Sequence, residues 1–181
     1  MFFYRILSKL LDYPDDELVS VLWEIRERAK FGGEFRPGEG RVVLDFIDRM
    51  EPLPLTEWQS SYVLTFDLTP EHALHLTHHL FGDDKNRGPA LIDLTEFYKE
   101  YGLEIVTRAE GADEGVNELP DFLPLVLEFA SQLHEGEAEM FLSQWAKVLN
   151  QLATNLEEAG SPYAPLVRLI GGRAQLIKAA A

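Results

Sequence analysis

The sequence predicts an all-α fold, a single compact helical bundle of about seven to nine helices. Apolar residues recur at intervals of three and four along most of the 181 residues, as in Leu18, Leu22, Ile25 and Ala29. Proline, acidic and glycine residues mark the places where these stretches begin and end. No segment shows the clear alternation of apolar and polar residues that is typical of a half-buried β-strand.

The expected helices follow one another through short connections. A capping box is predicted at Thr56 and Gln59, and Thr69, Pro70 and Glu71 form a typical helix start. Helices are predicted over residues 2–11, 14–29, 42–50, 56–66, 69–81, 89–101, 119–133, 140–160 and 161–178.

The length suits one domain over residues 1–181, because a chain of this size can bury a substantial core. Residues 103–118 are acidic and contain glycine, and their length predicts a mobile loop. The last predicted helix, over 161–178, is basic. This loop and this terminal helix are the two places where the composition departs from the rest of the chain.

The charge is strongly negative. The formal net charge is −15, and because residues 161–181 carry three basic and no acidic side chains, the first 160 residues carry −18. Such a surface repels nucleic acids and anionic membranes and attracts a basic partner. The alternative interpretation is that the acidic surface only keeps the protein soluble.

Several classes of function lose support from what the sequence lacks. There is no cysteine, which excludes disulfides and thiolate metal sites, and no apolar stretch approaches the roughly 18 residues that a membrane span requires. The N-terminus shows no signal-peptide pattern, so we expect a cytoplasmic protein. Nucleotide-binding and serine-hydrolase motifs are also missing from the sequence.

The histidines offer one candidate for chemistry. His75 and His79 are four residues apart on a predicted helix, and Glu71 lies one turn earlier. This spacing can hold a zinc or iron ion if another element supplies a third ligand. A small metal-dependent helical enzyme that uses His75, His79 and nearby carboxylates is therefore one hypothesis. The other interpretation is that both imidazoles are half-buried, hydrogen-bonded groups.

The middle of the chain resembles the TorD/NarJ family of redox enzyme maturation proteins, and most closely its nitrate reductase assembly chaperones. The resemblance rests on Tyr62-Val-Leu-Thr-Phe66-Asp67, Ala73-Leu-His75-Leu76, His79-Leu-Phe-Gly82-Asp83, Arg87-Gly-Pro-Ala90-Leu-Ile-Asp93-Leu94 and Glu118-Leu-Pro-Asp121-Phe-Leu-Pro-Leu125. The sequence differs from the family pattern at Thr65, His78, Phe81 and Phe122.

The resemblance implies an all-helical chaperone, monomeric or homodimeric, that binds and does not catalyse. Its partner would be the catalytic subunit of a molybdoenzyme, with the nitrate reductase alpha subunit as the expected client, held through its N-terminal peptide. The client would carry the cofactor, bis-molybdopterin guanine dinucleotide, and the chaperone would hold no cofactor or metal stably. No nucleic acid and no membrane insertion are implied.

The resemblance also implies a client-binding neighbourhood. Its aromatic residues would contact apolar side chains, its histidines would form hydrogen bonds, and its acids would pair with cations of the client, while the arginine would order the turn at 82–88. The residues are Tyr62, Phe66, Asp67, His75, His79, Arg87, Asp121 and Glu128. Charge reversal at Asp121 and Glu128 is accordingly predicted to weaken binding without unfolding the protein.

Overall fold

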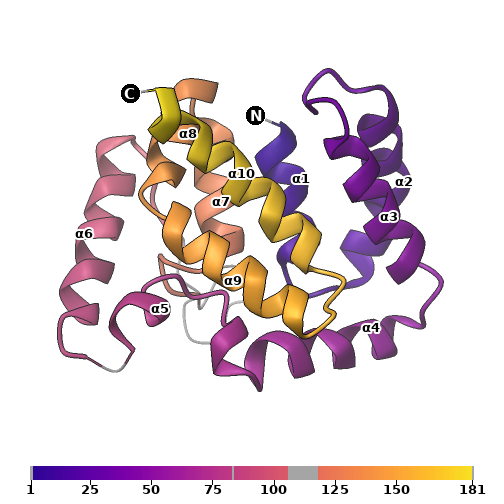
Figure 1. Cartoon of the computed structure of the whole chain (residues 1–181), viewed down its shortest axis with the longest axis horizontal. Helices are drawn as coiled ribbons and strands as arrows, with labels where there is room; N and C mark the ends of the chain where they lie inside the picture. The colour runs from indigo at the N-terminus through magenta and orange to yellow at the C-terminus, as the bar shows by residue number, and fades with distance from the viewer. Residues whose placement is uncertain (1, 83, 106–117, 181) are drawn as a thin grey trace.

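The computed structural model describes residues 2–82, 84–105 and 118–180, and it confirms the all-α fold (Figure 1). Ten α-helices, a π-helical segment η1 and a 3₁₀ turn η2 occur in these residues. In chain order they are α1 (Phe2–Leu11), α2 (Asp16–Phe31), α3 (Glu39–Met50), α4 (Leu55–Tyr62), η1 (Val63–Asp67), η2 (Pro70–His72), α5 (His78–Phe81), α6 (Arg87–Glu100), α7 (Leu123–Gln132), α8 (Glu135–Ser143), α9 (Ala146–Glu158) and α10 (Ala164–Ala180).

The helices pack around a central pair, α1 and α7. The α2–α3 hairpin flanks this pair on one side, and α8, α9 and α10 pack together across its front (Figure 1). Helix α4 and η1 run along the lower edge of the molecule in this view, and α6 stands at the opposite side from the hairpin. The segment formed by α4 and η1 therefore lies close to the turn between α9 and α10.

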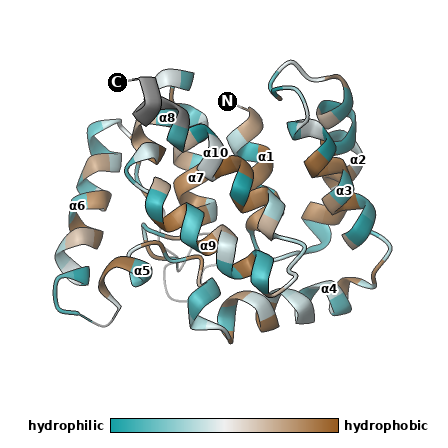
Figure 2. Cartoon of the chain, viewed as in Figure 1, coloured by the Kyte–Doolittle hydropathy of each residue, from teal (hydrophilic) through white to brown (hydrophobic). Residues whose placement is uncertain are grey.

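The buried apolar residues form one contiguous cluster. Helix α1 contributes its whole inner face, with Phe3, Tyr4, Leu7, Leu10 and Leu11 inaccessible to solvent. Hydrophobic residues also concentrate on α7 in the middle of the molecule (Figure 2). These central helices are apolar because neighbouring helices cover them on several sides.

The helix predicted over residues 69–81 does not form, and this prediction was wrong. After η2 the chain is extended: the Leu123 amide donates to the Leu74 carbonyl at 2.8 Å, and the Leu76 amide donates to the Asp121 carbonyl at 3.0 Å. In an extended segment, residues two apart share a face, so Leu74 and Leu76 both enter the core. Only the four residues of α5 are α-helical.

Other boundaries also differ from the prediction. The capping box at Thr56 is absent, because α4 begins at Leu55 and the Gln59 side chain donates instead to the Pro14 carbonyl at 2.9 Å. The helix predicted over 140–160 is divided into α8 and α9, because the Trp145 amide bonds to Leu142 in a tighter turn. Most of the loop predicted over 103–118 lies outside the described residues.

Candidate functional site

Tyr62 and Phe66 stand at the junction of α4 and η1, and both belong to the core. Their side chains are 3% and 5% exposed, and the Phe66 ring lies 4.8 Å from that of Tyr163. The Tyr62 hydroxyl donates to the Leu11 carbonyl at 3.1 Å. In the free protein these two aromatic residues pack α4 against α1 and the start of α10, and their contact with a client stays a prediction.

Asp121 is also buried, with no exposed surface. Its carboxylate accepts hydrogen bonds from the amide and the hydroxyl of Thr77, at 2.9 and 2.5 Å. Arg87 donates to the Thr77 hydroxyl at 3.1 Å and lies 3.9 Å from the carboxylate. Asp121 therefore fastens α5 and α6 to the start of α7. Because this carboxylate lies inside a buried network, we expect charge reversal at Asp121 to destabilise the fold, and its pairing with a client cation stays a prediction.

The two histidines do not share a helix face. Nε2 of His79 lies 2.7 Å from the Ala73 carbonyl, and burial lowers the pKa of this imidazole despite that hydrogen bond. His75 stacks beside Phe122 and lies 3.5 Å from Glu118. Among the described residues, no three histidine or carboxylate side chains are grouped so that they could hold a metal ion. The metal-enzyme hypothesis thus loses the geometry on which it depended.

The remaining members of the predicted neighbourhood are more accessible. Asp67 and Glu128 are exposed, His75 is about one-third exposed (31%), and Arg87 is one-quarter exposed (25%). They lie on η1, α7, the extended segment and α6, respectively. Their contact with a client stays a prediction.

A groove that the sequence did not reveal lies between the α4–η1 segment and the α9–α10 turn. Its volume is about 550 Å³. One wall consists of Glu57, Ser60, Ser61, Leu64 and Thr65, and the other walls are formed by Thr69, His72 and residues 159–162. The spacing of the first wall is that of one outward helix face. Two leucines on this segment, Leu64 and Leu68, are 62% and 66% exposed.

The two exposed leucines lie at the π-helical segment η1, Leu64 within it and Leu68 directly after it. A π-helix inserts an extra residue into a turn, and such segments recur at functional sites. Here Phe66 points into the core while Leu64 and Leu68 remain in solvent. The only signal in the sequence was an outward leucine in the helical pattern, which by itself is common on protein surfaces.

The surroundings of the groove are mostly acidic. The two segments that build it, 50–84 and 148–167, contain eight Asp or Glu residues and no Lys or Arg. Two of these acids are paired with arginines outside the segments, Glu51 with Arg26 and Glu157 with Arg168. Glu57, Asp67, Glu71 and Glu158 are exposed, and none of them forms an ion pair with another described residue. The negative charge of these four acids is therefore available to a cationic partner.

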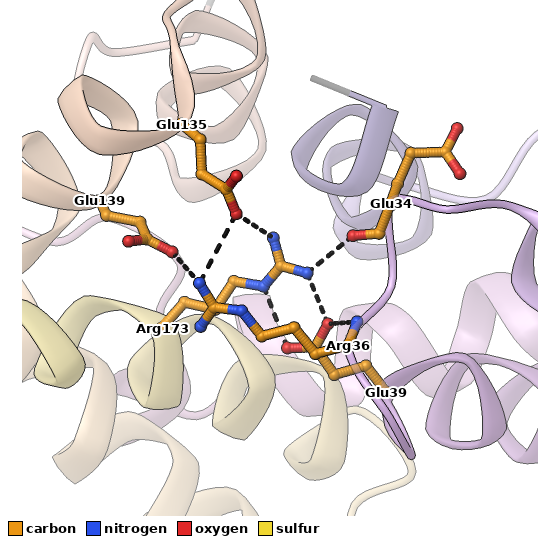
Figure 3. Close-up of polar contacts among 6 residues, drawn as sticks. All are labelled: Glu34, Arg36, Glu39, Glu135, Glu139 and Arg173. Carbon is orange, nitrogen blue, oxygen red and sulfur yellow. Dashed lines mark hydrogen bonds and ion pairs between the residues drawn. The ribbon is translucent and has the colours of Figure 1, made fainter.

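A second polar cluster, centred on the buried Arg173, lies where the loop before α3 meets α8 and α10 (Figure 3). It consists of Glu34, Arg36, Glu39, Glu135, Glu139 and Arg173. Arg173 is 1% exposed, donates to the Glu39 carboxylate and to the Glu34 carbonyl, and lies 3.4 Å from the centre of the Phe3 ring. This arginine joins the α2–α3 hairpin to α10.

The second arginine of that cluster makes the complementary connection. Arg36 donates to Glu139 on α8, and its side chain passes that of Arg173 in the opposite direction (Figure 3). Burial opposes ionisation of Glu39, but the hydrogen bonds from Arg173 and from the Arg36 amide outweigh it and lower the pKa of that carboxyl. These charges are largely paired within the protein, which indicates a clamp between elements and not a binding surface.

Comparison of the sequence with known proteins identifies the family of this chain. The sequence profile of the nitrate reductase delta subunit family matches residues 35–168. The chain is 31% identical over 165 residues to the nitrate reductase molybdenum cofactor assembly chaperone NarJ of Escherichia coli K12, covering 91% of this chain and 66% of that protein. It is 28% identical to the probable chaperone of the same name in Bacillus subtilis 168, covering 92% and 85%.

A further relative in Escherichia coli K12, the probable assembly chaperone NarW, is 29% identical over 88% of this chain and 62% of its own length. The chain thus spans about two-thirds of the length of the Escherichia coli relatives, 66% and 62%. The profile match covers well over half of the 181 residues, and it includes α4, η1 and the α9–α10 turn. This chain belongs to the nitrate reductase delta subunit family.

Proposed function

We propose that this protein is an assembly chaperone that binds the catalytic subunit of a nitrate reductase before the molybdenum cofactor is inserted. The observation that carries the proposal is the match to relatives named as molybdenum cofactor assembly chaperones over about nine-tenths of this chain. In this proposal bis-molybdopterin guanine dinucleotide belongs to the client, and the chaperone contributes a binding surface.

The structure supports a binding role through its surface. The unpaired acids around the groove, together with the exposed Leu64 and Leu68, offer charge and apolar contact to a client segment. A partly apolar, basic N-terminal peptide of the catalytic subunit has the complementary chemistry. No helix of the described residues is long and apolar enough to cross a membrane. We place the encounter in the cytoplasm, before the client reaches the membrane.

Co-purification tests this proposal. The full chain carrying an affinity tag is expressed in its native host under nitrate-respiring conditions, and bound proteins are identified by mass spectrometry. We expect the nitrate reductase catalytic subunit in its cofactor-free form. Recovery of cofactor-loaded subunit only, or of no molybdoenzyme subunit, would contradict the proposal. Metal analysis of the same sample tests the enzyme hypothesis, which stoichiometric zinc or iron on this chain would revive.

A further inference from the structure

We propose that the groove between the α4–η1 segment and the α9–α10 turn is where this protein holds its client, and that its occupant is a short peptide segment bearing both Arg or Lys and apolar side chains. This inference rests on the proposed function and locates it on the molecule. The groove differs from the neighbourhood expected from the family motifs, where Tyr62, Phe66 and Asp121 are buried in the free protein.

The apolar part of the groove comes from η1 and from the turn opposite. Leu64 lines the groove and is 62% exposed, and Leu68, which follows η1 outside the lining, is 66% exposed. Ala159 and Pro162 line the groove from the α9–α10 turn. Gly160 lies between these two with a φ of 66°, a left-handed conformation in which its missing side chain keeps this wall low. An apolar side chain of a peptide can therefore be covered from two sides.

Three of the five hydroxyl groups that line the groove already donate their protons within the protein. Ser60 donates its proton to the Thr56 carbonyl at 2.7 Å, and Thr65 donates to the Ser61 carbonyl at 2.7 Å. Thr69 likewise donates to the Leu64 carbonyl, at 3.2 Å. Since each hydroxyl has a single proton, the oxygens can only accept further hydrogen bonds. These three side chains therefore favour a donor-rich ligand.

The charge of the groove selects the same ligand. Glu57 is the one acidic residue of the lining, and the acids nearest along the chain, Asp67, Glu71 and Glu158, are exposed. With no Lys or Arg in either segment that builds the groove, nothing on these segments neutralises them. A guanidinium or ammonium group offers several donors and a positive charge, which satisfies both the acceptors and the acids.

Isothermal calorimetry on the full chain tests the inference with a synthetic peptide of the first residues of the client's catalytic subunit. The groove variant Glu57→Lys with Leu64→Ser is compared with a control on α6, Glu100→Lys with Ile92→Ser. The control makes the same chemical changes, and Ile92 is 64% exposed, close to the 62% of Leu64. We expect roughly 30-fold to 100-fold weaker binding by the groove variant, because one charge contact and one apolar contact are each worth about tenfold. We expect no more than about a twofold change by the control.

A second peptide, in which Gln replaces every Arg and Lys, tests the charge directly. We expect its affinity for the native protein to fall about tenfold or more and to depend less on salt, since the electrostatic attraction is removed. Equal affinity for both peptides would contradict the proposed ligand chemistry. If the groove variant proves unfolded by circular dichroism, Leu64→Ser alone replaces it, with Ile92→Ser alone as the matched control and an expected loss of about tenfold.

The outcomes separate this inference from the proposed function. If the native protein captures the catalytic subunit and both double variants bind the peptide equally well, the groove is the wrong location and the chaperone function stands. If the native protein captures no such subunit, the proposed function itself fails. Light scattering examines the alternative occupant: self-association that Leu64→Ser abolishes would assign the groove to a second copy of this chain and overturn the inference.

Discussion

Replacement of Asp121 by alanine should unfold the protein more readily and leave no specific mark on client binding. The Asp121 carboxylate is fully buried and accepts two hydrogen bonds from Thr77, one from its amide and one from its hydroxyl. The alanine variant removes Oδ2, the single oxygen that accepts both bonds. Arg87, which lies 3.9 Å from the carboxylate, is one-quarter exposed and can turn toward water.

The magnitude follows from the groups left behind. A buried donor deprived of its acceptor costs about 1–3 kcal/mol, so two such donors on Thr77 give about 3 kcal/mol for Asp121→Ala. For a protein of this length, 1 kcal/mol lowers the melting temperature by about 2–4 °C, which predicts a fall of about 6–12 °C. If the Thr77 hydroxyl rotates to another acceptor, the loss lies at the lower end of that range.

Urea unfolding followed by circular dichroism measures the change in the free energy of unfolding. Glu128→Ala is the matched control, because Glu128 is an exposed acid on α7, seven residues further along the chain. We expect the control to change stability by less than about 0.5 kcal/mol. Equal stability of Asp121→Ala and the native protein, combined with weaker peptide binding, would refute the reasoning and restore Asp121 as a client contact.

Two further predictions concern the clamp and the histidine. Arg173→Met should cost about 3–5 kcal/mol in the free energy of unfolding, because it leaves the Glu39 carboxylate without its buried partner; a chemical denaturation midpoint equal to that of the native protein would contradict the clamp. Burial lowers the pKa of His79 in the folded protein. The unfolded chain therefore binds the proton more readily, and the free energy of unfolding falls as the pH drops below about 6.5. His79→Gln should flatten the difference in stability between pH 7 and pH 5.5, and an unchanged pH dependence would show that this imidazole does not cause it.

The residues by themselves determined the fold class and most of the helices. Periodicity of three and four, together with proline and glycine at the boundaries, depends on local backbone sterics and on burying one face, and both act within a single helix. Gly102 shows this: its φ of 72° ends α6 where the pattern predicted an end. Family membership could also be predicted from the sequence, because the motif near Tyr62 and the motif near Asp121 are each an unbroken stretch of residues.

Tertiary contacts determined the backbone conformation of residues 69–81, and with it the positions of His75 and His79. The local sequence favours a helix there, but Leu74 and Leu76 form backbone hydrogen bonds with the start of α7 and both gain full burial by being extended. This pairing joins residues more than forty positions apart, and no local pattern encodes it. It separates His75 from His79 and removes the apparent metal site.

Burial likewise could not be assigned from residue type alone. Asp121 has the same side chain as Asp67, yet one is enclosed by Thr77 and the other is exposed on η1. Which acid serves the core and which faces a partner depends on which elements cover each position. The sequence by itself determined an acidic all-helical member of this family, and only the packing of α4 and η1 beside the α9–α10 turn decided that part of the acid surrounds a groove with exposed leucine.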